Sequence, residues 1–312
     1  MDIYIKTYLN KYEVEKFSSA SGTIFTKNEF IISISERYNE SNCFIMELPL
    51  SPSFGEMPND VINAIAQHNP TSSKAFKNCL DYFLNCNNFL YKSRKSHEFI
   101  IYTYGINELE KIYNNKEILV KIKSFNKQLN RLTQLINKTN KKFIIDFNRS
   151  LNKTELDKFL KQVNISKIYG IEQPFPINEK LKNFPFYNIA DESFTHHGYD
   201  NIHKYGYNAF IFKPFANNFC ELKKAIKNSK NYWGVVGSNI SGPLDCSFVN
   251  LLNNYLPIKL APRQNSHFIK HPLNAEINNL IKVINSTITV DNKVHLYLDK
   301  YCKKTAETVF SL

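Results

Sequence analysis

The sequence lacks several features that would place a protein in a class at once. No apolar run in its 312 residues approaches the ~18 residues that a membrane-spanning helix needs. The segment MDIYIKTYLN at the start has no basic region followed by an apolar stretch, so no secretory signal is expected. The six cysteines form no Cys-x-x-Cys pair, which argues against a disulfide scaffold or a zinc site. These absences predict a cytoplasmic protein with no membrane partner.

Acidic residues are few relative to basic ones, 28 against 40, and the formal net charge is +12. A basic surface can attract nucleic acid or an acidic membrane. The lysines are nevertheless spread along the whole chain, and the densest runs are the pairs Lys141-Lys142 and Lys303-Lys304. We therefore expect no nucleic-acid partner, and a positive field that helps to attract a small anionic substrate.

Residues 1–95 have the pattern of an α+β domain. Short segments rich in β-branched and aromatic residues predict strands, and two longer stretches predict helices. The expected strands are 3–8, 22–26, 30–35 and 44–48, and the expected helices are 58–67 and 72–84. Ser72 or Ser73 can cap the second helix.

From residue 96 to residue 285 the pattern changes, because short apolar runs alternate with polar, helix-like stretches. The runs are 99–105, 118–123, 142–147, 167–172, 187–191, 208–213, 232–238 and, more weakly, 257–261. This alternation predicts βαβ units and a parallel sheet. Seven or eight units in succession favour an α/β fold, a (β/α)7β barrel of the TIM type. A helix is expected at 274–284 and another near the C-terminus.

Most of the apolar runs end in a charged or polar residue. These residues are Lys123, Asp146, Glu172, Asp191, Lys213 and Ser238, at successive spacings of 23, 26, 19, 22 and 25 residues. Each spacing is about one βα unit. Because the carboxyl ends of barrel strands form one rim, where active sites are built, we expect these side chains to lie close together.

Asp146, Glu172 and Asp191 would place three carboxylates on three consecutive strands. Side by side they would repel strongly unless a divalent cation joined them. Oxygen ligands without His or Cys favour Mg²⁺, with Mn²⁺ as an alternative. Lys123 and Lys213 would then lie across the metal from one another. Such an arrangement suits abstraction of a proton next to a substrate carboxylate.

Five segments in order resemble successive motifs of the enolase superfamily, in its muconate-lactonising subgroup. They are Lys121-Ile-Lys123, Asp146-Phe-Asn148-Arg149, Ile171-Glu172-Gln173-Pro174, Ala190-Asp191-Glu192-Ser193 and Phe212-Lys213-Pro214. Residues 47–56 resemble the family's cap segment, and residues 235–242 resemble its serine-rich turn after the seventh strand. The o-succinylbenzoate synthases of menaquinone biosynthesis are the most similar group. The resemblance covers nearly the whole chain.

The resemblance implies a capping domain (1–95), a barrel (96–285) and a C-terminal segment (286–312) that returns to the cap. It also implies a hydro-lyase that dehydrates SHCHC, a cyclohexadiene hydroxy-carboxylate, through an enediolate. Lys123 would remove the α-proton and protonate the departing hydroxyl on the same face, and Lys213 would stabilise the enediolate by charge and cation–π contact.

The remaining residues take their roles from the same resemblance. Asp146, Glu172 and Asp191 would bind Mg²⁺, while Asn148 and Glu192 would orient those ligands. Lys121 would orient the substrate carboxylate and lower the pKa of Lys123. Ser238 and Ser241 would contact the substrate.

Other functions stay open at this point. N-acylamino acid racemases, dipeptide epimerases and cycloisomerases use the same lysines and metal. An Asp-x-Asp motif near the eighth strand would favour a dipeptide epimerase, and residues 257–263 contain none. The segment from Lys213 to Asn218 lacks the glycine that family members usually have after Lys-Pro, which leaves the substrate open. The alternative of another class is a non-catalytic basic binding protein. The sequence does not indicate an oligomeric state.

Overall fold

A computed structural model of the chain describes most of the cap and most of the barrel. The described residues are 2–19, 22–36, 39–48, 50, 56–86, 99–114, 119–214, 216–228, 233–236, 260–263, 281–284, 287–290, 298, 300 and 303–311. Within these ranges, no helix is both long enough and apolar enough to cross a membrane.

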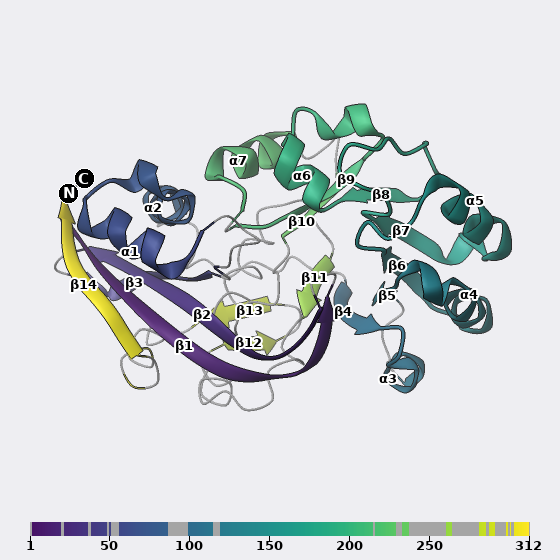
Figure 1. Cartoon of the computed structure of the whole chain (residues 1–312), viewed down its shortest axis with the longest axis horizontal. Helices are drawn as coiled ribbons and strands as arrows, with labels where there is room; N and C mark the ends of the chain where they lie inside the picture. The colour runs from purple at the N-terminus through teal and green to yellow at the C-terminus, as the bar shows by residue number, and fades with distance from the viewer. Residues whose placement is uncertain are drawn as a thin grey trace.

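An antiparallel sheet forms the base of the cap, in the order β14-β1-β2-β3. Its strands are β1 (Asp2–Ser19), β2 (Gly22–Glu36), β3 (Asn39–Leu48) and β14 (Lys303–Ser311). β2 is one continuous strand where two were expected, because the polar residues 27–29 pair in register with residues 10–12 of the even longer β1. Asp2 pairs with Ser311, so the two termini lie side by side at one end of this sheet (Figure 1).

Two helices pack on the cap sheet, α1 (Pro58–Ala66) and α2 (Lys74–Cys86), with the short 3₁₀ helix η2 (Pro70–Ser72) between them. Ser73 caps α2 as predicted, because its hydroxyl accepts from Phe76 N at 3.1 Å. Phe76 lies edge-on to Phe310 of β14, with ring centroids 5.6 Å apart. The C-terminal strand is thus packed against the helices of the N-terminal domain.

Eight parallel strands form the second sheet among the described residues, in the order β10-β9-β8-β7-β6-β5-β4-β11. They are β4 (Phe99–Gly105), β5 (Leu119–Lys123), β6 (Lys142–Asp146), β7 (Ile168–Glu172), β8 (Tyr187–Ala190), β9 (Ala209–Phe212), β10 (Trp233–Val236) and β11 (Leu260–Arg263). The first and the last strand of the series pair with each other, as in a barrel. The predicted barrel with a capping domain completed by the C-terminal tail is confirmed.

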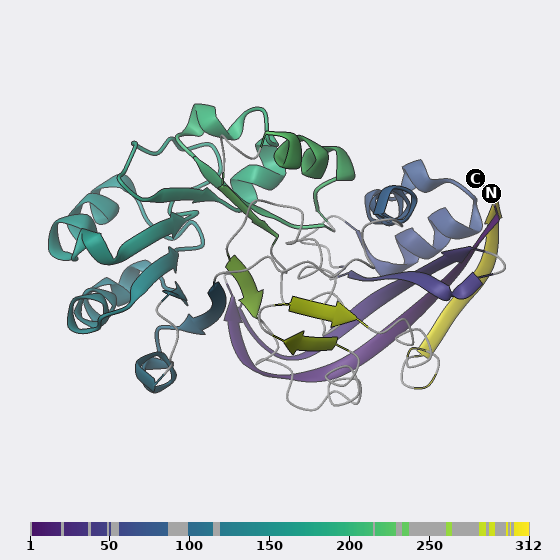
Figure 2. The same cartoon turned by 180° about the vertical axis from the view of Figure 1, so that it is seen from behind.

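Helices follow several barrel strands and lie on the outer side of the sheet (Figures 1 and 2). They are α3 (Leu109–Asn114), α4 (Leu129–Lys138), α5 (Lys153–Gln162), α6 (Glu192–His197) and α7 (Phe219–Lys227), with 3₁₀ turns η3 (Asn126–Gln128), η4 (Ile165–Lys167) and η5 (Ile202–Tyr205). α4 buries Leu132, Leu135 and Ile136, which the helical period places on one face. β5 to β9 bury nearly all of their apolar residues.

Three expectations about the C-terminal third need correction. The expected eighth strand at 257–261 continues to Arg263, because residues 260–263 pair in register with Phe99–Tyr102; residues 257–259 lie outside the described residues. Residues 281–284 of the expected helix form β12, which pairs with β13 (Thr287–Val290). Lys303–Ser311 is a strand, not a helix, because it completes the cap sheet beside β1. The domain bounds at 95 and 285 stay a prediction.

Candidate active site

The charged residues predicted to end the strands lie along one edge of the barrel sheet. Lys123, Asp146 and Glu172 are the last residues of β5, β6 and β7, and they pair with one another in register. Asp191 follows β8 directly, and Lys213 follows β9. Parallel strands bring their carboxyl ends to the same edge, so these five side chains share one rim.

Two lysines meet two carboxylates on the β5–β7 side of the rim. The Nζ atom of Lys121 lies 2.6 Å from Glu172 Oε1 and 3.4 Å from Asp146 Oδ2. Lys123 Nζ lies 3.9 Å from the same Asp146 oxygen. The side chains of Asp146 and Glu172 are only 4% and 2% exposed. This side of the site is therefore a buried cluster of two cations and two anions.

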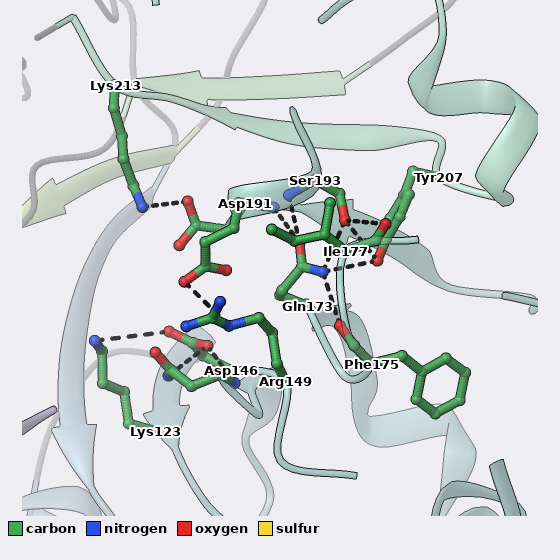
Figure 3. Close-up of polar contacts among 12 residues, drawn as sticks. Lys123, Asp146, Arg149, Gln173, Phe175, Ile177, Asp191, Ser193, Tyr207 and Lys213 are labelled. Atoms are coloured by element: carbon green, nitrogen blue, oxygen red, sulfur yellow. Dashed lines mark hydrogen bonds and ion pairs between the residues drawn. The ribbon is translucent and has the colours of Figure 1, made fainter. Parts of the chain in front are cut away.

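The β8–β9 side of the rim holds a separate pair. Lys213 Nζ forms an ion pair with Asp191 Oδ1, and both side chains are largely buried. Figure 3 shows Lys123 and Lys213 approaching from opposite sides, with Asp146 and Asp191 between them. The two amines therefore flank the acidic centre from opposite sides of the carboxylates.

Burial and neighbouring charge shift the carboxyl groups in opposite directions. Burial and the Asp146 carboxylate raise the pKa of Glu172 to about 8, although Lys121 opposes them. Burial alone would raise the pKa of Asp146, but the Lys121 and Lys123 ammonium groups outweigh it and hold this pKa below its ordinary value. Glu172 is therefore the carboxyl group that most needs a further cation to stay ionised near neutral pH.

Two of the lysines are held in the charged form. Burial by itself would lower the pKa of Lys121, but the Glu172 and Asp146 carboxylates raise it above its ordinary value. The pKa of Lys213 is raised in the same way, against burial, by Asp191 and Glu192. In this state of the protein, each of these two ammonium groups serves as the counter-ion of a buried carboxylate.

Amide side chains hold the charged residues at the rim. Asn148 donates to Asp146 Oδ1 from its side-chain nitrogen at 2.8 Å and from its backbone N–H at 3.1 Å. Its φ of 47° lies in the left-handed region, which Asn tolerates better than most residues. The Asn217 Oδ1 atom accepts from the backbone N–H of Lys213 at 2.9 Å. The backbone at Lys213 and the carboxylate of Asp146 are both fixed by these contacts.

Comparison with known proteins finds likeness in structure only. No family model matches the chain, and no curated protein matches it. An enolase family member from Agrobacterium tumefaciens, with homology to dipeptide epimerases and with sodium and L-Ala-L-Glu bound, superposes with a TM-score of 0.70 at 16% identity, over 92% of this chain and 98% of that one. The L-Ala-D/L-Glu epimerase from Bacillus subtilis superposes with a TM-score of 0.70 at 15% identity, over 92% and 95%.

The o-succinylbenzoate synthase from Thermosynechococcus elongatus, with Mg in its active site, superposes with a TM-score of 0.63 at 14% identity, over 85% of this chain and 94% of that one. The chain shares the fold of these structures, which are enolase-superfamily members. At these identities the likeness establishes the fold, and the reaction must be argued from the rim residues.

The rim of this enolase-superfamily fold fits a divalent cation in charge and donor type. Asp146, Glu172 and Asp191 supply only oxygen donors, the ligands that Mg²⁺ prefers. The Glu172 Oε2 atom is buried and has no hydrogen-bond partner among the described residues, and a buried carboxylate oxygen needs one. As the side chains lie, however, no group of three or more His, Cys, Asp or Glu in the described part of the chain is gathered closely enough to hold a metal ion.

Glu192 was predicted to orient the metal ligands, and it lies close to Arg149. Glu192 lies beside Asp191, and its Oε1 atom is 3.9 Å from Arg149 Nε. Arg149 received no role from the sequence, although it stands in the Asp146–Arg149 motif. Ser238 and Ser241 lie outside the described residues.

Gln173 was also given no role from the sequence, although it follows Glu172 directly. Its side chain is fully buried, and it makes the densest set of hydrogen bonds at this rim (Figure 3). The sequence does hold one sign of this role: Gln173 directly follows Glu172, the last residue of an apolar run. An amide at such a buried position is expected to be hydrogen-bonded.

Proposed function

We propose that this protein is a Mg²⁺-dependent enzyme that removes the proton next to a carboxylate of a small anionic substrate. The proposal is carried by one observation: Lys123 and Lys213 flank three carboxylates at the carboxyl rim of the barrel. Asp146, Glu172 and Asp191 would hold the metal. When bound, Mg²⁺ would supply positive charge that stabilises the substrate carboxylate as its α-proton leaves.

The specific reaction that we propose is the syn-dehydration of SHCHC to o-succinylbenzoate. The Cα–H bond breaks and its proton passes to Lys123 Nζ. The ammonium group of Lys213 stabilises the enediolate by charge, with Lys121 orienting the substrate carboxylate. The C–O bond to the hydroxyl group then breaks, and Lys123 returns the proton so that water leaves. The resemblance of the sequence to the o-succinylbenzoate synthases supports this reaction, and such a synthase is among the similar structures.

Epimerisation of a dipeptide is a second candidate. Two of the similar structures are described as an epimerase or a relative of epimerases, and their TM-scores of 0.70 exceed the 0.63 of the synthase. In an epimerase, one of the two flanking lysines removes the α-proton and the other returns one to the opposite face. The opposed placement of Lys123 and Lys213 suits this reaction equally well.

The experiment that separates these candidates follows the loss of SHCHC absorbance with purified protein, in Mg²⁺ and then in EDTA. Fast loss that EDTA abolishes supports the synthase. If SHCHC is stable, dipeptides and N-acylamino acids are incubated with the protein in D₂O and deuterium at Cα is measured. Exchange that depends on Mg²⁺ supports an epimerase or racemase. Absence of exchange with every substrate, together with salt-sensitive binding of polyanions, supports a non-catalytic basic protein instead.

The metal assignment has its own test in Asp191→Asn. We expect this variant to bind Mg²⁺ at least about tenfold more weakly by titration calorimetry, because a charged ligand becomes neutral. Asp157→Asn is the matched control, since Asp157 lies on α5 and forms a half-exposed pair with Lys182. Equal affinity in the wild type and in Asp191→Asn would remove Asp191 from the ligand set.

A further inference from the structure

The backbone of Gln173, directly after β7, is hydrogen-bonded to β8 and to the turn after β6. Its N–H donates to Ile189 O in β8 at 3.0 Å, and its carbonyl accepts from Arg149 N, after β6, at 2.7 Å. Its φ of 38° lies in the left-handed region, which a residue with a side chain adopts only when its surroundings hold it there. This turn directs the side chain of Gln173 across the rim, toward the junction of β8 and α6 (Figure 3).

The side-chain carbonyl of Gln173 accepts two backbone hydrogen bonds from the junction of β8 and α6. Its Oε1 atom accepts from Asp191 N at 3.1 Å and from Ser193 N at 3.0 Å. These two N–H groups belong to the peptide units on either side of the pair Asp191-Glu192. Fixing both peptide units fixes the directions in which the Asp191 and Glu192 side chains leave the backbone.

The amide nitrogen of Gln173 is anchored on the opposite side. Its Nε2 atom lies 2.9 Å from Phe175 O, 2.8 Å from Ser193 Oγ and 3.1 Å from Tyr207 Oη. An amide has two hydrogens, so these three acceptors satisfy its donor capacity fully. Ser193 Oγ in turn donates to Ile177 O at 3.2 Å. The side chain is therefore held at both ends, and only an uncharged group with one acceptor and one donor matches the site.

We propose that Gln173 is a positioning residue: it links the end of β7, where Glu172 lies, to the junction of β8 and α6, where Asp191 lies, and so sets the spacing of two carboxylates that would hold the metal. The inference rests on the metal site of the proposed function. It assigns Gln173 no contact with metal or substrate. Loss of the side chain frees the Asp191 backbone while Glu172 keeps its place in the strand register, and the metal site widens.

The test compares Gln173→Met with Gln134→Met, since Gln134 lies exposed on α4. Mg²⁺ affinity is measured by titration calorimetry on the full chain, well below the unfolding midpoint of each variant. We expect Gln173→Met to bind Mg²⁺ about 10- to 100-fold more weakly, the range found when side chains that orient metal ligands are removed. Gln134→Met should match the wild type. Affinity of Gln173→Met within about twofold of the wild type overturns the inference.

Two further substitutions separate the side chain from the backbone and remain informative if Gln173→Met does not fold. Gln173→Gly accepts the left-handed backbone but lacks the amide, so it should lose the same affinity as Gln173→Met. Gln173→Glu, in its protonated form, keeps one acceptor and one donor and should recover most of the affinity. Full affinity in Gln173→Gly would overturn the inference, because the backbone alone would then suffice.

The outcomes also distinguish this inference from the proposed function. Wild-type protein that binds Mg²⁺ but turns over no substrate contradicts the proposed function, whereas the affinity ratio between variants still decides the role of Gln173. Wild-type protein that binds no Mg²⁺ overturns both. In active protein, kcat of Gln173→Met should fall by a larger factor than KM rises, because the residue orients the reacting site and contacts no substrate.

Discussion

The barrel sheet and the cap sheet differ in the length, the direction and the connections of their strands. In the cap, β1 and β2 are 18 and 15 residues long, antiparallel, and paired without connecting helices. In the barrel, the strands are four to seven residues long and parallel, and most of those from β4 to β10 are separated by helices. Charged groups gather at one edge of the barrel sheet, whereas the described part of the cap sheet buries chiefly apolar side chains.

Because of this difference, we expect the cap sheet to contribute mainly to stability and the rim of the barrel sheet to hold the reacting groups. Parallel strands bring five charged residues to one rim, and buried ion pairs contribute little net stability because they lose their hydration. The cap sheet does not have to hold such a cluster of charges, and its β-branched residues pack against α1 and α2. The two regions meet where α2 contacts α7, through Tyr82 against Phe219 and through Asn85 with Lys223. Substitutions on either side of this boundary should therefore act on different measurements.

The strongest contrast comes from the two flanking lysines of the barrel. Lys123→Ala and Lys213→Ala should each lower turnover by about 10²- to 10⁴-fold, the usual contribution of general acid–base catalysis. The far-ultraviolet circular dichroism should stay that of the wild type. Lys158→Ala, on the exposed face of α5, is the control and should retain full activity. Turnover near the wild-type rate in either rim variant would contradict its assigned role.

The opposite profile is expected in the cap. Phe76→Ala removes a fully buried ring that packs on Phe310, and it should lower the free energy of unfolding by about 3–5 kcal/mol. Mg²⁺ affinity should not change below the unfolding midpoint. Tyr113→Ala, at an exposed position in α3, should change stability by less than about 0.5 kcal/mol. A Phe76→Ala protein that keeps its stability but loses Mg²⁺ binding would break the division between the two regions.

The free energy of unfolding should depend on pH, because the pKa of Glu172 at the rim is raised in the folded protein. The Glu172 carboxyl group keeps its proton up to a pKa of about 8 in the folded protein but ionises near 4.5 in the unfolded chain. The folded state therefore binds more protons between these values, and the free energy of unfolding falls as pH rises from 4.5 to 8. Each pH unit between the two pKa values contributes about 1.4 kcal/mol.

The shift of Asp146 has the opposite sign, because its pKa is lowered and its contribution is lost only as pH falls below 3.8. Asp146 therefore adds no change above pH 5, and we expect the free energy of unfolding in EDTA to decline by on the order of 4 kcal/mol from pH 5 to pH 8, measured by urea unfolding. Saturating Mg²⁺ should abolish this decline, because it keeps the Glu172 carboxylate charged. The decline should also vanish in Glu172→Gln, and its persistence there would assign it to another group.

The smallest effect is expected at the contact between cap and barrel. Tyr82 Oη donates to Asn217 O at 3.4 Å, so Tyr82→Phe should cost only about 0.5–1 kcal/mol of stability. Hydrogen exchange should quicken in α2 and in the turn after β9. Tyr199→Phe removes a similar contact with Asn228 O inside the barrel and is the matched control. Faster exchange in α2 of the control as well would show that Tyr82 does not couple the two regions.

Much of the barrel could be predicted because its strands are continuous apolar runs. Residues 99–105 coincide with β4, and most other runs match their strands to within one or two residues. The long cap strands and β14 could not be predicted from local pattern. Residues 27–29 are polar, and 303–311 carries two lysines and a glutamate, yet both segments become strands because β1 offers unpaired N–H and carbonyl groups along its whole length.

The amino-acid sequence by itself determined the class of fold, the order of the barrel strands and the five charged residues at or directly after the ends of β5 to β9, because the alternation of short apolar runs and helix-like stretches is a local property. Only the tertiary structure decided which charges pair. Lys121, two residues before the strand end, is the amine that contacts Glu172 and Asp146 most closely, and Gln173 reaches the backbone of Asp191 from a neighbouring strand. Such pairings depend on the sheet register and on left-handed turns at single residues, which bring together groups that lie 18 to 51 positions apart in the chain.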